Sequence, residues 1–301
     1  MKKTIVLALF CFYLSGCVPL DRVNPTDPKA SNFYGFEFTG NMTDSSLFSI
    51  GDFVFNGSDV FLVDTIGGRA HKIGGSESYS WAGSINISGT DYPILDNPAG
   101  ICFDGSYIYI TDANTHNLQV FAAVPDISVS KVVSVPQSAG KIACDNTYLY
   151  IASTEPGAPE VRRYLKSAVM SAALGGAVTH DAVFDTTGIV EISDIEVHHS
   201  GNVLVADRGT RRIVRFTSAG AQAGSMSFTF LFTGFGVTGD RIYMPHSSGI
   251  TEADYASGAV LRTFANYGEG EGRIEAFGPA EASGDKIAAV RMKKISVFLK
   301  H

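Results

Sequence analysis

The sequence predicts an all-β fold, a six-bladed β-propeller made of four-stranded blades. Three observations predict it: a strand–turn–strand unit recurs six times, its period is close to 45 residues, and one unmatched strand precedes the first unit. Short strands repeating at this period are typical of propeller blades, because one small twisted sheet cannot bury its faces alone and must stack on its neighbours around an axis.

The clearest unit runs from Gly201 to Phe216. An apolar strand ends at Asp207, a polar turn follows, and a second strand leads from Arg212 to the aromatic Phe216. The residue at the place of Asp207 defines a landmark position in every unit. The six landmark residues are spaced by 48, 41, 54, 39 and 45 residues, and they are Asp64, Asp112, Ser153, Asp207, His246 and Arg291.

Each unit holds four predicted strands. In the second unit an inner strand covers 100–103, a hairpin turn of the Asp-Gly type follows, and the next strands cover 107–111 and 118–121. A more variable outer strand closes the unit, at 128–135 in this unit and at 81–87 in the first. The 54-residue spacing is explained by a small, apolar insertion at 167–180, which we expect to form a short helix or flap packed over blade three.

The ring is predicted to close with an N-terminal strand. The last unit stops after its third strand, 295–298, whereas the alternating residues 33–39 read as a strand with no unit of their own. This strand is expected to complete blade six and to remove the free sheet edges. The propeller domain is therefore predicted to span 33–301.

The N-terminus predicts export. Residues 1–16 combine two lysines, an apolar run and Leu14-Ser15-Gly16 before Cys17, as in a signal peptide too short to remain in a bilayer. The motif resembles the lipobox of bacterial lipoproteins, which implies cleavage before Cys17 and lipid on that residue, with export to a cell membrane or outer membrane. Residues 17–32 are rich in Pro, Asp and Asn and read as a flexible tether.

Charge limits the partners. The chain has 23 basic and 30 acidic residues, a net charge of −7. Nucleic acid is disfavoured, since phosphates require a basic face, and membrane attachment is left to the lipid. The expected oligomeric state is a monomer.

Only two cysteines belong to the predicted domain, Cys102 and Cys144. In the repeat alignment Cys102 matches Ala143, so the two cysteines are one position apart in register and are expected to point to opposite faces. Because a disulfide needs close Cα atoms and converging side chains, both are predicted to be free and packed.

Once aligned, the units resemble NHL-repeat β-propellers. The best copies are Asn202–Asp207 with Arg212–Phe216, and Tyr107–Asp112 with Thr115–Phe121; blades three, five and six depart from the pattern at their landmarks. The resemblance implies turn-holding roles for a set of acidic and basic residues, and Asp side chains commonly accept backbone hydrogen bonds in such turns. These structural turn residues are Asp64, Asp112, Asp207, Arg212 and His116.

Candidate ligand-binding residues lie where blades differ from the common unit. His246 replaces a landmark Asp and precedes a predicted enlarged turn at 247–258, and a second enlarged turn is predicted at 154–160. Long loops at one end of a propeller are the usual specificity elements. The candidates are His246, Arg208, Arg211, Glu252, Asp254 and Glu155.

A metal remains an alternative. His198 and His199, with Asp194 and Glu196 on the same predicted strand, could contribute to a calcium or zinc site in the channel, although zinc needs three or four converging ligands and the sequence identifies no full set. No cofactor is predicted.

Two enzyme families with six-bladed propellers have recognisable site residues. Peptide-amidating lyases place zinc-binding histidines at the starts of inner strands, where this chain has 99–101, 140–142 and 193–195 without histidine. Gluconolactonase-like propellers use a Glu, Asn and Asp set that has no match here. The sequence favours a non-catalytic module that binds a protein, peptide or glycan ligand; the alternative is a metal-dependent lyase or hydrolase at the channel mouth.

Overall fold

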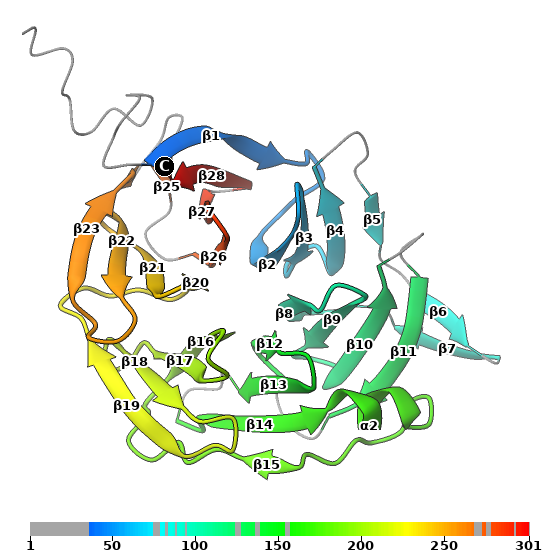
Figure 1. Cartoon of the computed structure of the whole chain (residues 1–301). Helices are drawn as coiled ribbons and strands as arrows, with labels where there is room; N and C mark the ends of the chain where they lie inside the picture. Colours follow the sequence, from blue (N-terminus) through cyan, green and yellow to red (C-terminus); the bar gives the residue numbers. More distant parts are fainter. Residues whose placement is uncertain are drawn as a thin grey trace, which may run out of the picture.

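The structure is a computed structural model, and it describes residues 36–74, 79–81, 84–87, 89–93, 95–123, 128–135, 139–153, 157–267, 273–274, 278–291 and 293–300. Six four-stranded antiparallel sheets are arranged around a central axis as a six-bladed β-propeller, which confirms the predicted fold (Figure 1). The predicted signal peptide, Cys17 and the predicted tether lie outside the described residues. Within the described residues, no helix has both the length and the apolar character needed to cross a membrane.

Blades one to three follow the order inner strand to outer strand along the chain. Blade one is β2 (Ile50–Asn56), β3 (Asp59–Asp64), β4 (Arg69–Ile73) and β5 (Tyr79–Trp81). Blade two is β8 (Pro98–Phe103), β9 (Tyr107–Asp112), β10 (Asn117–Ala122) and β11 (Ser128–Ser134). Blade three is β12 (Ile142–Cys144), β13 (Tyr148–Ser153), β14 (Glu160–Leu165) and β15 (Ala182–Val183).

Blades four and five continue the pattern. Blade four is β16 (Ile192–Val197), β17 (Val203–Asp207), β18 (Arg212–Phe216) and β19 (Gln222–Ser227). Blade five is β20 (Gly236–Thr238), β21 (Arg241–His246), β22 (Gly249–Asp254) and β23 (Val260–Phe264). A two-strand parallel pairing of β24 (Asn266–Tyr267) with β25 (Arg273–Ile274) lies between blades five and six in the sequence.

Blade six is built from both ends of the described chain. Its strands β26 (Ala280–Ser283), β27 (Lys286–Arg291) and β28 (Lys294–Lys300) are completed by the N-terminal strand β1 (Phe36–Thr43), which pairs antiparallel with β28 (Figure 1). The predicted closure of the ring by an N-terminal strand is confirmed, although β1 extends to Thr43 rather than ending at Thr39.

The core lies between the blades. Six clusters of buried apolar side chains are found, and each joins residues of two adjacent blades; one seals blades five and six through Phe36, Tyr243 and Phe264, for example. The second strand of each blade is buried on both faces, because it has a neighbouring blade on either side. This explains why strands such as Val203–Asp207 are apolar up to the landmark residue.

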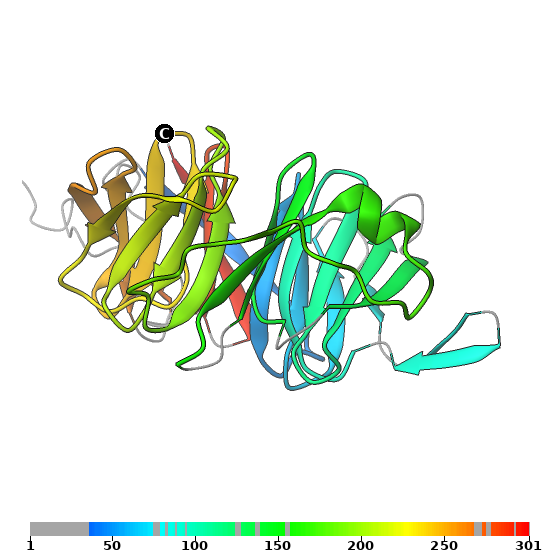
Figure 2. The ribbon, with the colours of Figure 1, turned by 90° about the horizontal axis from the view of Figure 1, so that it is seen from below.

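The propeller has two ends, which we call the turn end and the hairpin end. The turn end carries the turns between second and third strands, including all landmark residues, and the segments that enter each inner strand. The hairpin end carries the hairpins between first and second strands, the start of β1 at Phe36 and the end of β28 at Lys300, which pair with each other. In Figure 2 the helix α2 (Lys166–Ser171) lies at the hairpin end.

The structure differs from the prediction at the outer strand of blade one, and it shows the form of the insertion in blade three. The outer strand of blade one is not 81–87: β5 pairs with β4, whereas β6 (Ser84–Ile87) pairs with β7 (Thr90–Pro93) in a separate hairpin that projects from the ring (Figure 2). The insertion of blade three forms α2 and a following segment. Their side chains Val169 and Val178 are buried in the cluster between blades two and three.

Candidate functional site

The landmark carboxylates of blades one, two and four are fully buried and accept several hydrogen bonds each. Asp64, for example, accepts from the backbone N–H groups of Phe48 (2.6 Å), Ser49 (2.8 Å) and Gly67 (3.0 Å). The same arrangement surrounds Asp112 and Asp207. Each landmark Asp therefore ties its turn to the segment that enters the inner strand of its own blade, and its oxygens are already engaged.

His246 occupies the landmark position in blade five. The side chain is buried, its Nε2 lies 2.6 Å from Thr251 Oγ1, and Nδ1 accepts from Ser248 N–H at 3.3 Å. Burial lowers the pKa of His246 to about 4, so the imidazole is neutral at pH 7. The ring stacks on Phe230 at 4.1 Å between centroids. His246 thus has structural partners on each side and does not project into solvent.

The enlarged turn predicted at 247–258 was wrong. β22 begins at Gly249, so only Ser247 and Ser248 separate it from β21. Gly249 has φ of 132°, and a Cβ there would lie 2.4 Å from the carbonyl oxygen of Ala265, so glycine is required for this tight turn. The strand carries a buried threonine and a buried glutamate, which hide its apolar alternation in the sequence.

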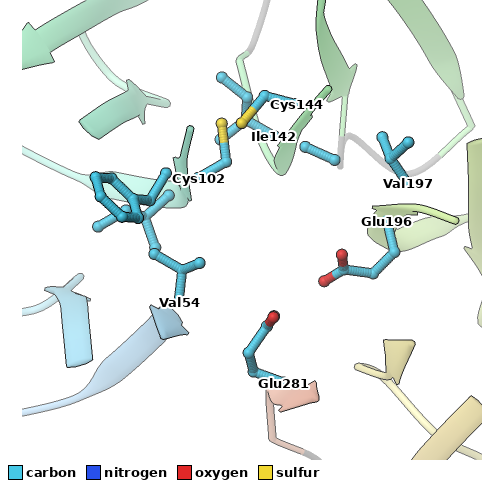
Figure 3. Close-up of a pocket in the computed structure, with 10 residues that line it drawn as sticks. Val54, Cys102, Ile142, Cys144, Glu196, Val197 and Glu281 are labelled. Carbon is cyan, nitrogen blue, oxygen red and sulfur yellow. The ribbon is translucent and has the colours of Figure 1, made fainter. Parts of the chain in front are cut away.

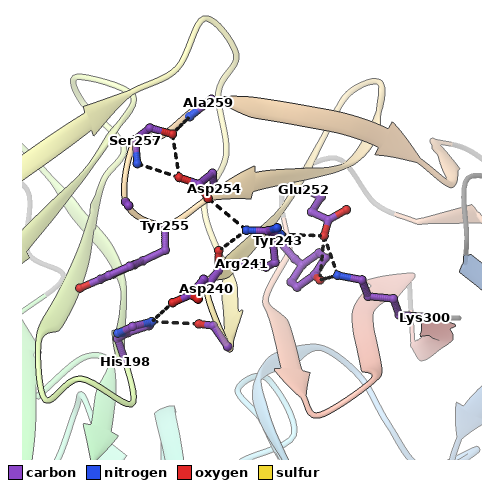
Figure 4. A network of polar contacts seen from close by, with 12 residues as sticks. His198, Asp240, Arg241, Tyr243, Glu252, Asp254, Tyr255, Ser257, Ala259 and Lys300 are labelled. Atoms are coloured by element: carbon purple, nitrogen blue, oxygen red, sulfur yellow. Dashed lines mark hydrogen bonds and ion pairs between the residues drawn. The ribbon is translucent and has the colours of Figure 1, made fainter.

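Glu252 and Asp254 lie on β22 and have ionic partners (Figure 4). Glu252 is 1% exposed; its carboxylate pairs with Arg262 and with Lys300 Nζ at 2.8 Å. Asp254 pairs with Arg241 at 3.0 Å at the hairpin end. The structure therefore does not bring these two residues together with His246 at the turn end. Glu155 lies outside the described residues.

The candidate arginines lie in the blade-four turn. Arg208 is exposed and forms an ion pair with Glu191 at 2.5 Å. Arg211 has φ of 56° and takes the same place in its turn as His116, with φ of 53°; its role in the backbone is that of a left-handed turn residue. Arg212 pairs with Asp207 at 3.2 Å.

His198, His199 and the exposed Asp240 come within metal-binding reach of one another at the hairpin end, whereas Asp194 and Glu196 are not part of this group. Both nitrogens of His198 are already used. Nε2 lies 2.9 Å from the carbonyl oxygen of Gly239, and because a carbonyl only accepts, Nε2 must carry the proton. Nδ1 accepts from Ser200 N–H at 3.2 Å, and the ring stacks on Tyr255 at 3.6 Å (Figure 4). This hydrogen bonding gives His198 a structural place between blades four and five.

The central channel contains two facing glutamates, of which the sequence had indicated only Glu196 as a possible metal ligand. One register position of the six inner strands faces the axis, and it is occupied by Val54, Cys102, Ala143, Glu196, Gly236 and Glu281. A cavity of about 130 Å³ lies beside these residues, with Glu196 and Glu281 facing each other across it (Figure 3). It has room for several waters or an ion, and is much smaller than the 300–1,000 Å³ of ordinary small-molecule pockets.

A second charged layer lies two residues earlier on the inner strands. Asp52 accepts from Ile101 N–H at 3.2 Å and Asp194 accepts from Phe235 N–H at 2.9 Å, so each carboxylate bridges to the next blade. Lys141 lies 3.2 Å from Asp52 and donates to the carbonyl oxygen of Gly51. Burial raises the pKa of Asp194 to about 7, against the lowering effect of Lys141. This layer holds the inner strands together.

The Glu196 and Glu281 carboxyls interact with each other in the channel. Burial raises the pKa of both groups well above the ordinary value; for Glu196 the charge of Glu281 is the next cause, and for Glu281 the charge of Asp52. Two carboxyls in one low-dielectric site share a proton because both cannot ionise cheaply. The pair could move a proton or bind a cation.

We expect the substitution Glu281→Gln to stabilise the protein at high pH. A carboxyl whose pKa is raised in the folded state contributes its full stabilisation of the fold below its unfolded pKa, which is near 4.5. That stabilisation is lost as pH rises through the folded pKa. Glutamine cannot ionise, so at pH 8 the variant should be more stable by about 1–2 kcal/mol, and the difference should vanish near pH 4. Urea unfolding at the two pH values measures it. Asp285→Asn, at an exposed carboxyl, is the control; equal pH profiles for both variants would contradict the prediction.

Four exposed apolar side chains lie on segments at the turn end. Phe48 (59% exposed) and Ile66 (74%) belong to blade one, Val190 (53%) precedes the inner strand of blade four, and Leu231 (36%) precedes that of blade five. Phe48 and Val190 occupy equivalent places, since each donates its backbone N–H to the landmark Asp of its blade. The backbone is therefore fixed while the side chain points to solvent.

Sequence reasoning named Arg208 and Arg211 at this end but missed the apolar residues beside them. The signal was present: Phe48 and Val190 stand just before an inner strand at the position where blade two has Asp96. A comparison of the entry segments, rather than of the landmark turns alone, could have found them.

The fold defines the protein as a six-bladed β-propeller, and known structures share it. Virginiamycin B lyase from Staphylococcus aureus is similar with a TM-score of 0.59 and 12% identity, covering 88% of this chain and 100% of that one. A catalytically inactive variant of the same enzyme with quinupristin is similar with a TM-score of 0.55 and 11% identity, covering 83% and 80%.

A propeller from a nidogen/laminin complex is similar with a TM-score of 0.53 and 17% identity, covering 71% of this chain and 79% of that one. No protein-family model matches the chain, and no curated protein matches it. At these identities the likenesses show the fold alone, and the fold is shared by an enzyme and by a protein-binding domain.

Proposed function

We propose that this protein is a lipid-anchored propeller of the cell envelope that binds a protein, peptide or glycan ligand at its turn end without converting it. The observation that carries the proposal is a set of four exposed apolar side chains on turn-end segments of blades one, four and five: Phe48, Ile66, Val190 and Leu231. Apolar residues held on well-ordered loops at one end of a domain favour a protein or peptide ligand. Arg208 adds an exposed charge beside Val190.

The rigidity of the turn end supports binding. The entry segments of blades one and four are fixed by buried carboxylates, so a ligand would not have to order them on association. By contrast, His246 and Glu252 are already bound to partners within the fold. These contacts favour a pre-formed recognition surface over a reactive centre at this end.

The test compares Phe48→Asp with Val260→Asp. Both wild-type residues are more than half exposed, but Val260 lies on the outer strand β23, away from the turn end. Ligands selected from peptide and glycan arrays with the wild-type protein should bind the Phe48 variant at least tenfold more weakly and the Val260 variant unchanged. Equal binding by both variants would place the ligand elsewhere and defeat the proposal.

A second function, a metal-dependent lyase or hydrolase, is favoured by one observation, the shared-proton pair Glu196 and Glu281 in the channel. Zinc or calcium analysis of the purified protein discriminates between the two functions. One equivalent of metal in the wild type, lost in Glu281→Gln, would favour the enzyme. The small cavity volume makes this the second choice.

The anchor at Cys17 is part of the proposal. β1 starts at Phe36 at the hairpin end, so a tether from Cys17 would join the propeller on the end opposite to the exposed apolar side chains. This arrangement leaves the turn end available to ligands in the surrounding compartment. The variant Cys17→Ala should be released from the membrane fraction, and its continued presence there would refute the lipid anchor.

A further inference from the structure

Cys102 and Cys144 are free thiols on the inner strands β8 and β12, and they belong to neighbouring blades. Both line the channel cavity, and their side chains interact with each other there (Figure 3). The predicted register and the free state of both thiols are confirmed, since Cys102 aligns with Ala143. Opposite faces do not keep the two cysteines apart, however, because Cys102 on β8 and Cys144 on β12 both point into the core between blades two and three.

The backbones of β8 and β12 lie close to each other next to the two cysteines. A Cβ added to Gly100 on β8 would lie 2.8 Å from the backbone nitrogen of Ile142 on β12. Glycine therefore lets the backbones of the two strands approach closely, two residues before each cysteine. Disulfides form between residues whose Cα atoms lie about 4.4–6.8 Å apart with converging Cβ atoms. Thiols already in contact across such a seam need only a small shift.

We propose that Cys102 and Cys144 are a redox-sensitive pair that forms a reversible disulfide between blades two and three when a peroxide enters the channel. The Cys144 thiol, the less buried of the two, attacks one peroxide oxygen, and the O–O bond breaks to give a sulfenic acid and one water. The Cys102 sulfur then attacks that sulfenic sulfur, and its proton leaves with the hydroxyl as a second water. Two thiols lose two electrons and two protons, and one peroxide molecule accepts them.

The surroundings suit this chemistry. The cavity of about 130 Å³ admits a molecule as small as hydrogen peroxide, whereas a large oxidant would be held at the channel mouth. Burial raises the pKa of Cys102, which keeps it protonated and makes it the second, resolving thiol. The disulfide would close a loop between two inner strands and so stabilise the ring.

The test treats the folded full-length protein with hydrogen peroxide and maps its peptides without reduction. Trypsin releases Cys102 in fragment 73–131 and Cys144 in fragment 142–162, which also separates them from Cys11 and Cys17. The expected result is a linked pair of these two fragments, lost again on reduction, with a Tm several degrees higher in the oxidised protein. Linkage should fall at least tenfold when peroxide is added in concentrated urea, because the contact is then lost.

Two controls are the single-cysteine variants and the comparison of oxidised with reduced wild-type protein. Cys102→Ser and Cys144→Ser should each abolish both the linked peptide and the rise in Tm, while the comparison of oxidised with reduced wild type needs no variant. Unlinked fragments, with cysteines unmodified or over-oxidised in a protein that stays folded, would overturn the proposal. Equal linkage in folded and unfolded protein would overturn it as well.

Discussion

Replacing Phe36 with alanine is expected to destabilise the propeller by about 3–5 kcal/mol, the usual cost of removing a buried phenylalanine side chain. Phe36 is 1% exposed, stacks on Phe264 at 3.8 Å between ring centroids, and meets Tyr243 edge-on at 6.0 Å. It also holds the end of β1 against β23, so the cavity would weaken the closure of the ring. Urea unfolding followed by circular dichroism measures the change.

Phe48→Ala is the matched control, because the same side chain is removed from a position that is 59% exposed. Its effect should be within about 0.5 kcal/mol of zero. If the two alanine variants had similar stabilities, β1 would not contribute to closing blade six in solution as it does in the structure.

Replacing Asp207 with alanine is expected to cost about 3–5 kcal/mol, because a buried charged partner would be removed from several donors. Asp207 is fully buried and accepts from Val190 N–H (3.2 Å), Glu191 N–H (3.1 Å) and Thr210 Oγ1 (2.6 Å), besides pairing with Arg212. The pKa of Asp207 is lowered by these hydrogen bonds against the raising effect of burial. The stability that it contributes is therefore present above the unfolded pKa and is lost as pH falls through the folded value.

Thermal and urea unfolding at pH 7 give the comparison, and Asp240→Ala provides the control. The Asp240 side chain is 74% exposed, and its loss should change stability by less than about 0.5 kcal/mol. A cost for Asp207→Ala no greater than that of the control would show that the landmark carboxylate is dispensable to its turn.

The repeated features of the fold could be predicted from the sequence because each blade solves the same packing problem. Second strands are buried by blades on both sides, so runs such as Val203–Asp207 and Tyr107–Asp112 are recognisable without an alignment of relatives. The unmatched N-terminal strand and the missing outer strand of the last unit together indicated the closure by β1. Each signal lies within a short stretch of the sequence, whereas the contact that they predict joins strands far apart in the chain.

The site was harder to predict because its residues break the pattern for different reasons. Glu252 lies in a strand that looked like a loop, since its charge is neutralised by Arg262 and by Lys300 from another blade. Glu196 and Glu281 meet across the axis only when the six inner strands are in register. Periodicity within one strand contains no information about which residues of distant blades face each other.

The pairing of β1 with β28 has a consequence for the order in which the chain can fold. Residues 36–43 pair with 294–300, so the contact that completes blade six spans almost the whole described chain. Contacts of such large sequence separation form slowly, since the entropy of closing the intervening loop must be lost first. During synthesis, the outer edge of β28 cannot be covered until residues 294–300 have emerged, and β1 must stay unpaired until then. Premature pairing of β1 with the exposed edge of another strand is thus the error that this chain must avoid while it folds.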